Sequence, residues 1–590
     1  MKKYTSVILS IFLLVSIVGG TGLWVRAFYA SIRNYRSPLQ TVELQPQPPV
    51  SSHPTKVVLV LISGLGYDAS NILTLPILEQ LRRAGASLAV ESIPPTYSQT
   101  AWTTLVTGAP PEINDAPPLD LPLEELHLLK TDTIFARAHN ARLKTALLGP
   151  AEWRRLIPRN QLDYTFFVDQ PGPEADEAIV EAVLPLINGG KAELVLVHFT
   201  ELDFAGQNLG GAAGEAYQQA AQRIDTYLGQ ISAAMDLTHS VLVVMADHGH
   251  IPDGGHGGAE AEVIWQPLVL IGEKIIPGRY SDAFQIDIVP TVSALLGLAT
   301  PTASQGRILY ELLWLNEQDR TIAQLSLARQ RLALAEAYIA RIEETSPAPI
   351  AMIQADLVQA QTSLAKNNVS GAFQLAKLVQ EEANQAMTAA KNHRLNAENL
   401  PRLIVTVLIT FFWFAVMWRR RGVHAGSILI AAIATIALYH VLFQLQGYSY
   451  SISSLKDFSK IPLETARRTG VSLLAGGGLV LVFLILVNEE NWLTMLGTVY
   501  GFSVLTTFIF ALPVCWAFWQ NGFVADWRLP GVIPAFWQAH GLLETMIAAT
   551  LGLIMPWPIM SLSLLVNLVR SQLSESRTRT DTDVLPGLHL

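Results

Sequence analysis

The chain has 590 residues, carries a net charge of −9 and is 50% hydrophobic. This length is enough for one domain with a full hydrophobic core and for further modules. The acidic balance, without a long basic tract, excludes nucleic acid as an expected partner. The single cysteine, Cys515, excludes an intramolecular disulfide and any zinc or redox site built from cysteines.

The N-terminal segment predicts a membrane anchor. Tyr4 to Val25 is an apolar run after the basic residues Lys2 and Lys3, and about 20 apolar residues can cross the hydrocarbon core of a membrane. A cleaved signal peptide begins in a similar way. The run is long, however, and no A-x-A cleavage pattern follows it, so we expect an uncleaved anchor. Residues 30–55, rich in proline, serine and glutamine, predict a tether.

The region after the tether predicts an α/β domain. Three continuous apolar runs, Val57–Ile62, Leu194–Val197 and Val241–Met245, are typical of strands that are buried on both faces. Amphipathic stretches at 72–84 and 174–187 predict helices between them. Strands that alternate with helices indicate a mostly parallel sheet flanked by helices. Ligands of such sheets bind at the carboxyl ends of the strands.

Residues 316–400 predict a helical segment. They are rich in alanine, leucine, glutamine and glutamate at helical spacing, and Ser346–Pro349 and Asn367–Gly371 divide them into three helices. The last two helices resemble one hairpin of a helical repeat. A spacer packed on the α/β domain is the simpler interpretation, and a surface for a protein partner is the alternative.

Five apolar stretches predict further membrane-spanning helices. They cover residues 403–418, 427–446, 471–488, 493–518 and 541–568. Span ends that are flanked by basic residues tend to lie in the cytoplasm. Such residues occur at 2–3, 419–421 and 570–579. The 447–470 loop is also basic but would lie outside in the resulting topology, so it breaks the pattern. We expect six spans in the cell membrane, with both termini in the cytoplasm and the α/β domain outside.

The predicted organisation therefore has six parts, and membrane lipids are among the expected partners. The parts are a transmembrane anchor (1–29), a tether (30–55), the α/β domain (56–315), the helical segment (316–400), a five-helix transmembrane region (401–570) and a cytoplasmic tail (571–590).

Polar motifs punctuate the predicted α/β domain. In chain order they are Ser63-Gly64-Leu65, the segment Pro94–Gly108, Glu201–Gln207, Ala246–His250 with Gly255–Gly258, and Asp287–Thr291 with Leu295–Gly297. Several of them directly follow a predicted buried strand, where the chemistry of a parallel sheet is expected. A single Asp-His-Gly motif would be weak evidence, but five motifs in a fixed order are specific.

In this order the motifs resemble the alkaline phosphatase superfamily, including its nucleotide pyrophosphatases/phosphodiesterases, over about 260 residues. The resemblance implies a nucleophile at Ser98, ten residues before the glycine that ends its segment, and two divalent metal ions, zinc or manganese. It assigns one ion to Asp203, Gln207 and His256. It assigns the other to Ser63, Asp247, His248 and Ser98.

Two of these positions depart from the family pattern. Ser63 stands where the family has aspartate, and Gln207 stands where the family has histidine. A serine hydroxyl is a neutral, weak ligand and an amide oxygen is a poor ligand for zinc, so we expect weaker binding of both ions. The groups close enough in sequence to compensate are Asp68, Glu201, His250 and Asp253.

Two hypotheses for the function follow. The first is a metal-dependent phosphoester hydrolase or phosphotransferase at the outer face of the membrane, in which metal coordination activates the Ser98 hydroxyl. The order of anchor, catalytic domain and helix bundle resembles the glycolipid ethanolamine-phosphate transferases, so a phosphoester or lipid-linked substrate is expected. The second is a catalytically impaired or inactive family member that serves as a membrane scaffold or binding protein.

Overall fold

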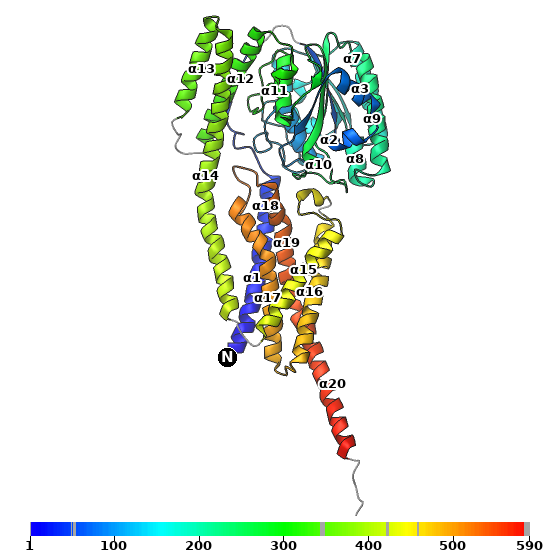
Figure 1. Cartoon of the computed structure of the whole chain (residues 1–590), viewed down its shortest axis with the longest axis vertical. Coiled ribbons are helices and arrows are strands. Elements are labelled where there is room, and N and C mark those ends of the chain that lie inside the picture. The colour runs from blue at the N-terminus through cyan, green and yellow to red at the C-terminus, as the bar shows by residue number, and fades with distance from the viewer. Residues whose placement is uncertain are drawn as a thin grey trace, which may run out of the picture.

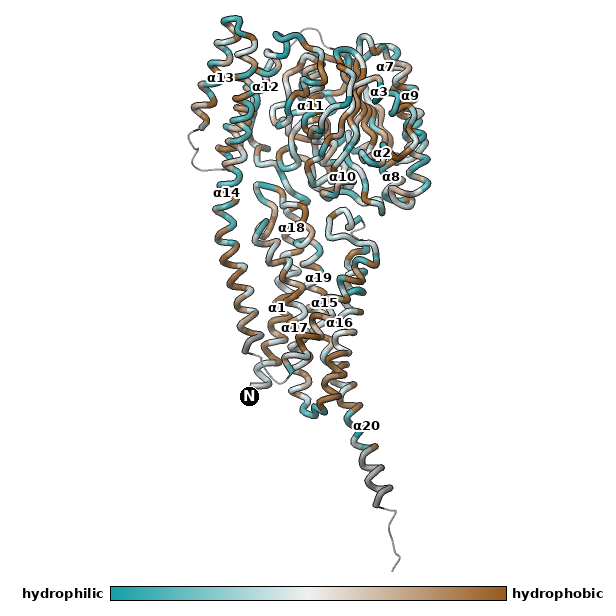
Figure 2. Tube along the Cα trace, viewed as in Figure 1, coloured by the Kyte–Doolittle hydropathy of each residue, from teal (hydrophilic) through white to brown (hydrophobic). Residues whose placement is uncertain are grey.

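The structure is a computed structural model that describes residues 2–48, 50, 55–342, 349–419, 424–456 and 459–582. The predicted break at Ser346 and the last residues of the predicted tail lie outside these ranges. An α/β domain stands at one end of a bundle of long helices, and the N-terminus lies at the other end (Figure 1). Figure 2 shows that the helices of the bundle are largely apolar, whereas the outer helices of the α/β domain carry many polar residues.

The α/β domain is built on one nine-stranded sheet. The strands are β1 (Lys56–Ile62), β2 (Ala86–Glu91), β3 (Thr145–Pro150), β4 (Tyr164–Val168), β5 (Leu194–Phe199), β6 (Ser240–Ala246), β7 (Trp265–Gly272), β8 (Gly278–Arg279) and β9 (Ala283–Phe284). Their order is β4-β3-β5-β1-β6-β7-β2-β8, and β9 pairs with β2. Only β7 runs antiparallel to its neighbours, β6 and β2. The mostly parallel sheet is therefore confirmed, and the three predicted strands form its centre as β5-β1-β6.

Helices cover both faces of this sheet (Figure 1). One face carries α2 (Tyr67–Ile72), α3 (Pro76–Ala84), α7 (Pro173–Asn188), α8 (Glu201–Asn208) and α9 (Glu215–Ala234). The other face carries α4 (Ser98–Thr107), α5 (Ile134–Asn140), α6 (Trp153–Leu156) and α11 (Ile288–Leu295). The short helix α10 (Ala261–Ile264) directly precedes β7. Alternate side chains of β1 enter the two cores, with Val57, Leu59 and Leu61 on one side and Val58 and Val60 on the other. A strand that is buried on both faces explains the continuous apolar run.

The helical segment leads directly into the bundle. It consists of α12 (Glu317–Ile342), α13 (Pro349–Ala365) and the 51-residue α14 (Val369–Arg419). Alanine and leucine side chains of α12, α13 and α14 share one apolar core. Because α14 continues through Pro401 without interruption, the helical segment and the first apolar stretch of the bundle share one helix (Figure 1).

Among the described residues, six helical stretches are long and apolar enough to cross a membrane, and the chain is a membrane protein. They lie in α1 (Lys2–Arg33), α14, α15 (Ala425–Leu445), α16 (Ile461–Leu486), α17 (Trp492–Asn521) and the run Val532–Leu573, which includes α18 (Val532–Phe536), the π-helical turn η6 (Trp537–Gly541), α19 (Leu542–Ile554) and the start of α20 (Pro556–Thr582). The loop between α15 and α16 lies at the end of the bundle that faces the α/β domain (Figure 1).

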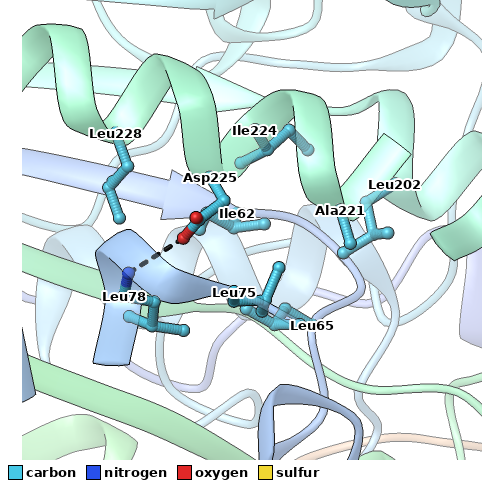
Figure 3. Close-up of a pocket in the computed structure, with 9 residues that line it drawn as sticks. All are labelled: Ile62, Leu65, Leu75, Leu78, Leu202, Ala221, Ile224, Asp225 and Leu228. Carbon is cyan, nitrogen blue, oxygen red and sulfur yellow. Dashed lines mark hydrogen bonds between the residues drawn. The ribbon is translucent and has the colours of Figure 1, made fainter. Parts of the chain in front are cut away.

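A buried carboxylate of α9 caps the start of α3. The residue before α3, Leu75, has no side chain that can accept a hydrogen bond from the first turn. Asp225 accepts these bonds instead, at 2.9 Å from the backbone nitrogen of Ile77 and 2.8 Å from that of Leu78. Apolar side chains around it enclose a cavity of about 10 Å³ (Figure 3), which has room for one water molecule at most. Asp225 therefore ties α3 to α9 beside the end of β1.

We expect Asp225→Ala to lower the free energy of unfolding by about 1–3 kcal/mol, because two buried N–H groups lose their acceptor. The measurement is the thermal unfolding midpoint of the purified protein in detergent. Asp169→Ala is the matched control, because Asp169 is exposed and forms only a surface ion pair. Equal midpoints for the two variants would contradict this role of Asp225.

Candidate active site

The carboxyl ends of β1, β5 and β6 meet at one edge of the sheet. Ser63 follows β1, Asp203 lies in the first turn of α8 after β5, and Asp247 and His248 follow β6. Ser98 is the first residue of α4. All seven residues that the resemblance implicates are linked by contacts of 4.0 Å or less. In Figure 1 this edge, marked by α8 and α10, is turned toward the bundle.

Asp247 is fully buried and accepts hydrogen bonds from four donors. Oδ1 accepts from the backbone nitrogens of Gly64 (2.9 Å) and His248 (2.8 Å). Oδ2 accepts from the Ser63 hydroxyl (2.6 Å) and from Trp102 Nε1 (2.7 Å). These bonds compensate the cost of burying a carboxylate, and they occupy both of its oxygens.

Ser98 faces His248. The Ser98 hydroxyl lies 3.1 Å from His248 Nε2, and His248 Nδ1 lies 3.1 Å from the carbonyl oxygen of Gly249. Since a carbonyl only accepts, the proton of a neutral His248 ring belongs on Nδ1, and the lone pair of Nε2 points at Ser98. Burial lowers the pKa of His248 to about 4, so the ring is neutral near pH 7. Ser98 can therefore donate its hydroxyl proton to His248.

Three imidazoles converge on the carboxylate of Asp203. His250 Nε2, His248 Nε2 and His256 Nε2 lie 3.1, 3.9 and 4.0 Å from Asp203 Oδ1. Burial opposes ionisation of Asp203, but the contact with His250 and the other two imidazoles outweigh it and lower the pKa of Asp203 well below its usual range. Asp203 is therefore an anion that faces nitrogen ligand atoms.

His250 is the residue that the resemblance does not assign to either ion. Its side chain is fully buried, and among the described residues neither ring nitrogen has a hydrogen bond of good geometry. The ring reaches Asp203 because Gly206 leaves the space: a Cβ at Gly206 would lie 2.9 Å from His250 Nε2. The signal in the sequence was a second histidine two residues after His248.

The other three candidates for compensation point elsewhere. Asp68 and Asp253 are exposed. Glu201 is buried and pairs with Arg223 of α9, whose Nε lies 2.9 Å from Glu201 Oε1. Of the four groups, His250 alone contacts Asp203.

Gln207 lies between Asp203 and His256. Its Nε2 is 2.8 Å from both oxygens of Asp203 and 2.8 Å from His256 Nε2. The amide therefore crosslinks two of the side chains that the resemblance assigns to one ion. The structure holds this arrangement by hydrogen bonds from within the chain.

The groups around Asp203 have the composition of a metal site. Catalytic zinc sites commonly have three imidazole or carboxylate ligands and one open position, with ligand atoms about 3.3 Å apart. Asp203, His250 and His256 have this composition, and His250 Nε2 and His256 Nε2 lie 3.1 and 4.0 Å from Asp203 Oδ1. Asp203, His248 and His250 form the group of described residues whose ligand atoms all lie within 4.8 Å of one another.

Part of the chain is similar to a known protein family. The model of the family described as type I phosphodiesterase / nucleotide pyrophosphatase matches residues 57–115 and 129–253. This match confirms the predicted resemblance of the α/β domain to the alkaline phosphatase superfamily.

Among its relatives, the catalytic subunit of GPI ethanolamine phosphate transferase 2 of Homo sapiens is 26% identical over 286 residues, which are 45% of this chain and 28% of that protein. The catalytic subunit of GPI ethanolamine phosphate transferase 3 of Mus musculus is 27% identical over 288 residues, 44% of this chain and 26% of that protein. The match thus spans about a quarter of the length of these relatives. The solved structure of human ectonucleotide pyrophosphatase / phosphodiesterase 5 is 13% identical, with a TM-score of 0.35, and the match covers 41% of this chain and 95% of that chain.

We expect Trp102→Phe to lower the free energy of unfolding by about 1.5–3 kcal/mol, because Asp247 loses one hydrogen bond to a charged acceptor while the aromatic ring is retained. The measurement is again the thermal unfolding midpoint in detergent. Trp314→Phe, at an exposed position, is the control. An unchanged midpoint in Trp102→Phe would show that Asp247 does not need this donor.

Proposed function

We propose that this protein is a membrane-bound phosphoester transferase that uses Ser98 as its nucleophile. The observation that carries the proposal is the hydrogen bond from Ser98 to His248 beside the cluster around Asp203. A serine hydroxyl is a weak nucleophile until an adjacent base takes its proton. Ser98 also begins the ten-residue α4, and the partial positive charge of a helix N-terminus favours a bound phosphate.

The reaction proceeds in two displacements at phosphorus. In the first, Ser98 Oγ forms a bond to phosphorus, its proton passes to His248 Nε2, and the bond from phosphorus to the leaving alcohol breaks. The departing alkoxide takes the proton back from His248. In the second, the oxygen of an acceptor alcohol, or of water in a hydrolytic side reaction, forms a bond to phosphorus and its proton passes to His248 Nε2. The bond from phosphorus to Ser98 Oγ breaks, and Ser98 Oγ takes the proton back from His248.

In this proposal Asp203, His250 and His256 would hold one divalent cation. When bound, such an ion would polarise a phosphoryl oxygen and neutralise the charge that develops on it. His250 would supply an imidazole in place of the histidine that the family has at the position of Gln207. A second ion, as the family resemblance leads one to expect, is less favoured here because Ser63 and Trp102 occupy Asp247 Oδ2.

The substrate class that fits this arrangement is a lipid-linked phosphoester. The catalytic edge of the sheet faces the end of the bundle (Figure 1), so a head group at the membrane surface lies on the side of Ser98. Relatives of the chain are named as GPI ethanolamine phosphate transferases. With the charge pattern of the spans, we assign the site to the outer face of the cell membrane.

We expect Ser98→Ala to abolish turnover of an aryl phosphodiester, with a loss on the order of 10⁴-fold or more, because no other group replaces the nucleophile. Intact-protein mass spectrometry after rapid quenching detects the phosphoserine that Ser98 forms. Ser281→Ala, at an exposed loop position, is the control and keeps full activity. Wild-type turnover in Ser98→Ala would rule out this nucleophile.

The second candidate function is a catalytically impaired membrane scaffold or binding protein. The observation that favours it is Gln207, whose amide crosslinks Asp203 and His256 without an ion. In such a protein the helical segment α12–α14 is the candidate surface for a partner. The two candidates differ in one property, the binding of a cation by the purified chain.

We expect the purified protein to bind one zinc ion per chain, and His250→Ala to lower the affinity by more than about 100-fold, since even outer partners of metal ligands are worth about 10–100-fold. Competition with a chelator measures the affinity, and elemental analysis measures the content. His239→Ala removes an exposed histidine and serves as the control. Absence of bound zinc from the wild-type protein would favour the scaffold instead.

A further inference from the structure

The loop between α15 and α16 contacts the loop that carries His256. Ser453, in the short helical turn η5 (Ile452–Ser454), is buried at 1% exposure. Its hydroxyl accepts a hydrogen bond from the backbone nitrogen of Gly258 (2.8 Å) and donates one to Glu260 Oε2 (2.8 Å). A residue of the membrane bundle thus reaches two positions beyond His256.

The two loops approach each other backbone to backbone. A Cβ at Gly255 would lie only 1.9 Å from the carbonyl oxygen of Ser453, so no side chain fits at the position before His256. The two loops are therefore in direct backbone contact at this point. The close approach at Gly255 and the hydrogen bonds of the Ser453 hydroxyl together hold the His256 loop against the bundle.

The opposite side of the His256 loop is held by Thr96, two residues before Ser98. The backbone nitrogen of Thr96 bonds to the carbonyl oxygen of Gly257 (3.1 Å), and its hydroxyl bonds to that of Gly258 (3.0 Å). His256 Nδ1 lies 3.3 Å from the carbonyl oxygen of Thr96. His256 is therefore clamped between the nucleophile segment and the membrane bundle.

The loop that carries Ser453 is anchored firmly in the bundle. Arg468 of α16, buried at 2% exposure, donates a hydrogen bond to Gln446 Oε1 (2.8 Å) at the start of the loop. The Phe443 ring at the end of α15 stacks on Tyr448 and Tyr450 of the loop, with ring centroids 5.3 and 5.0 Å apart. These contacts restrict the loop, so Ser453 is a fixed point rather than a mobile one.

We propose that Ser453 is a positioning residue through which the membrane bundle sets the place of His256 in the catalytic site. Ser453 acts through the backbone of Gly258 and the carboxylate of Glu260, and it touches no reacting atom. This inference rests on the proposed cation at Asp203, His250 and His256. It implies that the α/β domain has its full cation affinity only when it is docked on the bundle.

The test compares zinc affinities of full-length variants in detergent by chelator competition. Ser453→Ala is expected to bind zinc about 10–100-fold more weakly than the wild type, as the loss of an outer partner of a metal ligand does. Ser453→Thr keeps the hydroxyl and is expected to restore most of the affinity. Ser449→Ala is the matched control, because Ser449 bonds to Ser454 within the same loop.

A second variant guards against a general loss of structure. Glu260→Ala removes the acceptor of the Ser453 hydroxyl and is expected to weaken zinc binding in the same direction, with a thermal midpoint close to that of Ser449→Ala. Equal zinc affinity in the wild type, Ser453→Ala and Glu260→Ala would overturn the positioning role and leave the proposed function standing. A wild-type chain that binds no zinc would overturn both.

Discussion

The carboxylate of Asp203 sets the conditions that the rest of the site must meet. A largely buried anion is costly unless positive or polar partners surround it, and here three imidazoles and one amide do so. These partners come from three places: α8 itself (Gln207), the end of β6 (His248 and His250) and the loop that follows it (His256). The parallel sheet brings these segments to one edge, and Gly206 leaves the room that His250 needs.

The substitutions at Ser63 and Gln207 have different consequences. Ser63 gives its hydroxyl to Asp247 and, with Trp102, closes that carboxylate within a hydrogen-bonded network. Gln207 bonds to Asp203 and His256, while His250 contacts Asp203 from the segment after β6. These contacts favour the proposed roles, in which His248 accepts the proton of the Ser98 hydroxyl and the groups around Asp203 bind a single cation.

The sequence predicts the central strands and the order of motifs because both are local patterns: apolar runs mark strands that are buried on two faces, and polar residues follow them. The approach of His250 to Asp203 could be named only as an option, since it depends on the space above Gly206. The contact of Ser453 with Gly258 joins residues 195 positions apart, and no pattern in either loop announces it. The continuity of α14 could not be predicted either, because its polar first part and its apolar second part have the patterns of two separate helices.

X-ray absorption at the zinc edge of the zinc-loaded, full-length protein tests the central claim most directly, because it reports the atoms around the ion. The account predicts one zinc ion with nitrogen and oxygen neighbours at about 2.0–2.2 Å, two of them from imidazole rings. It predicts no metal–metal scattering. A second zinc ion at about 3.5–4 Å, or a shell without imidazole, would contradict the single site built on Asp203, His250 and His256.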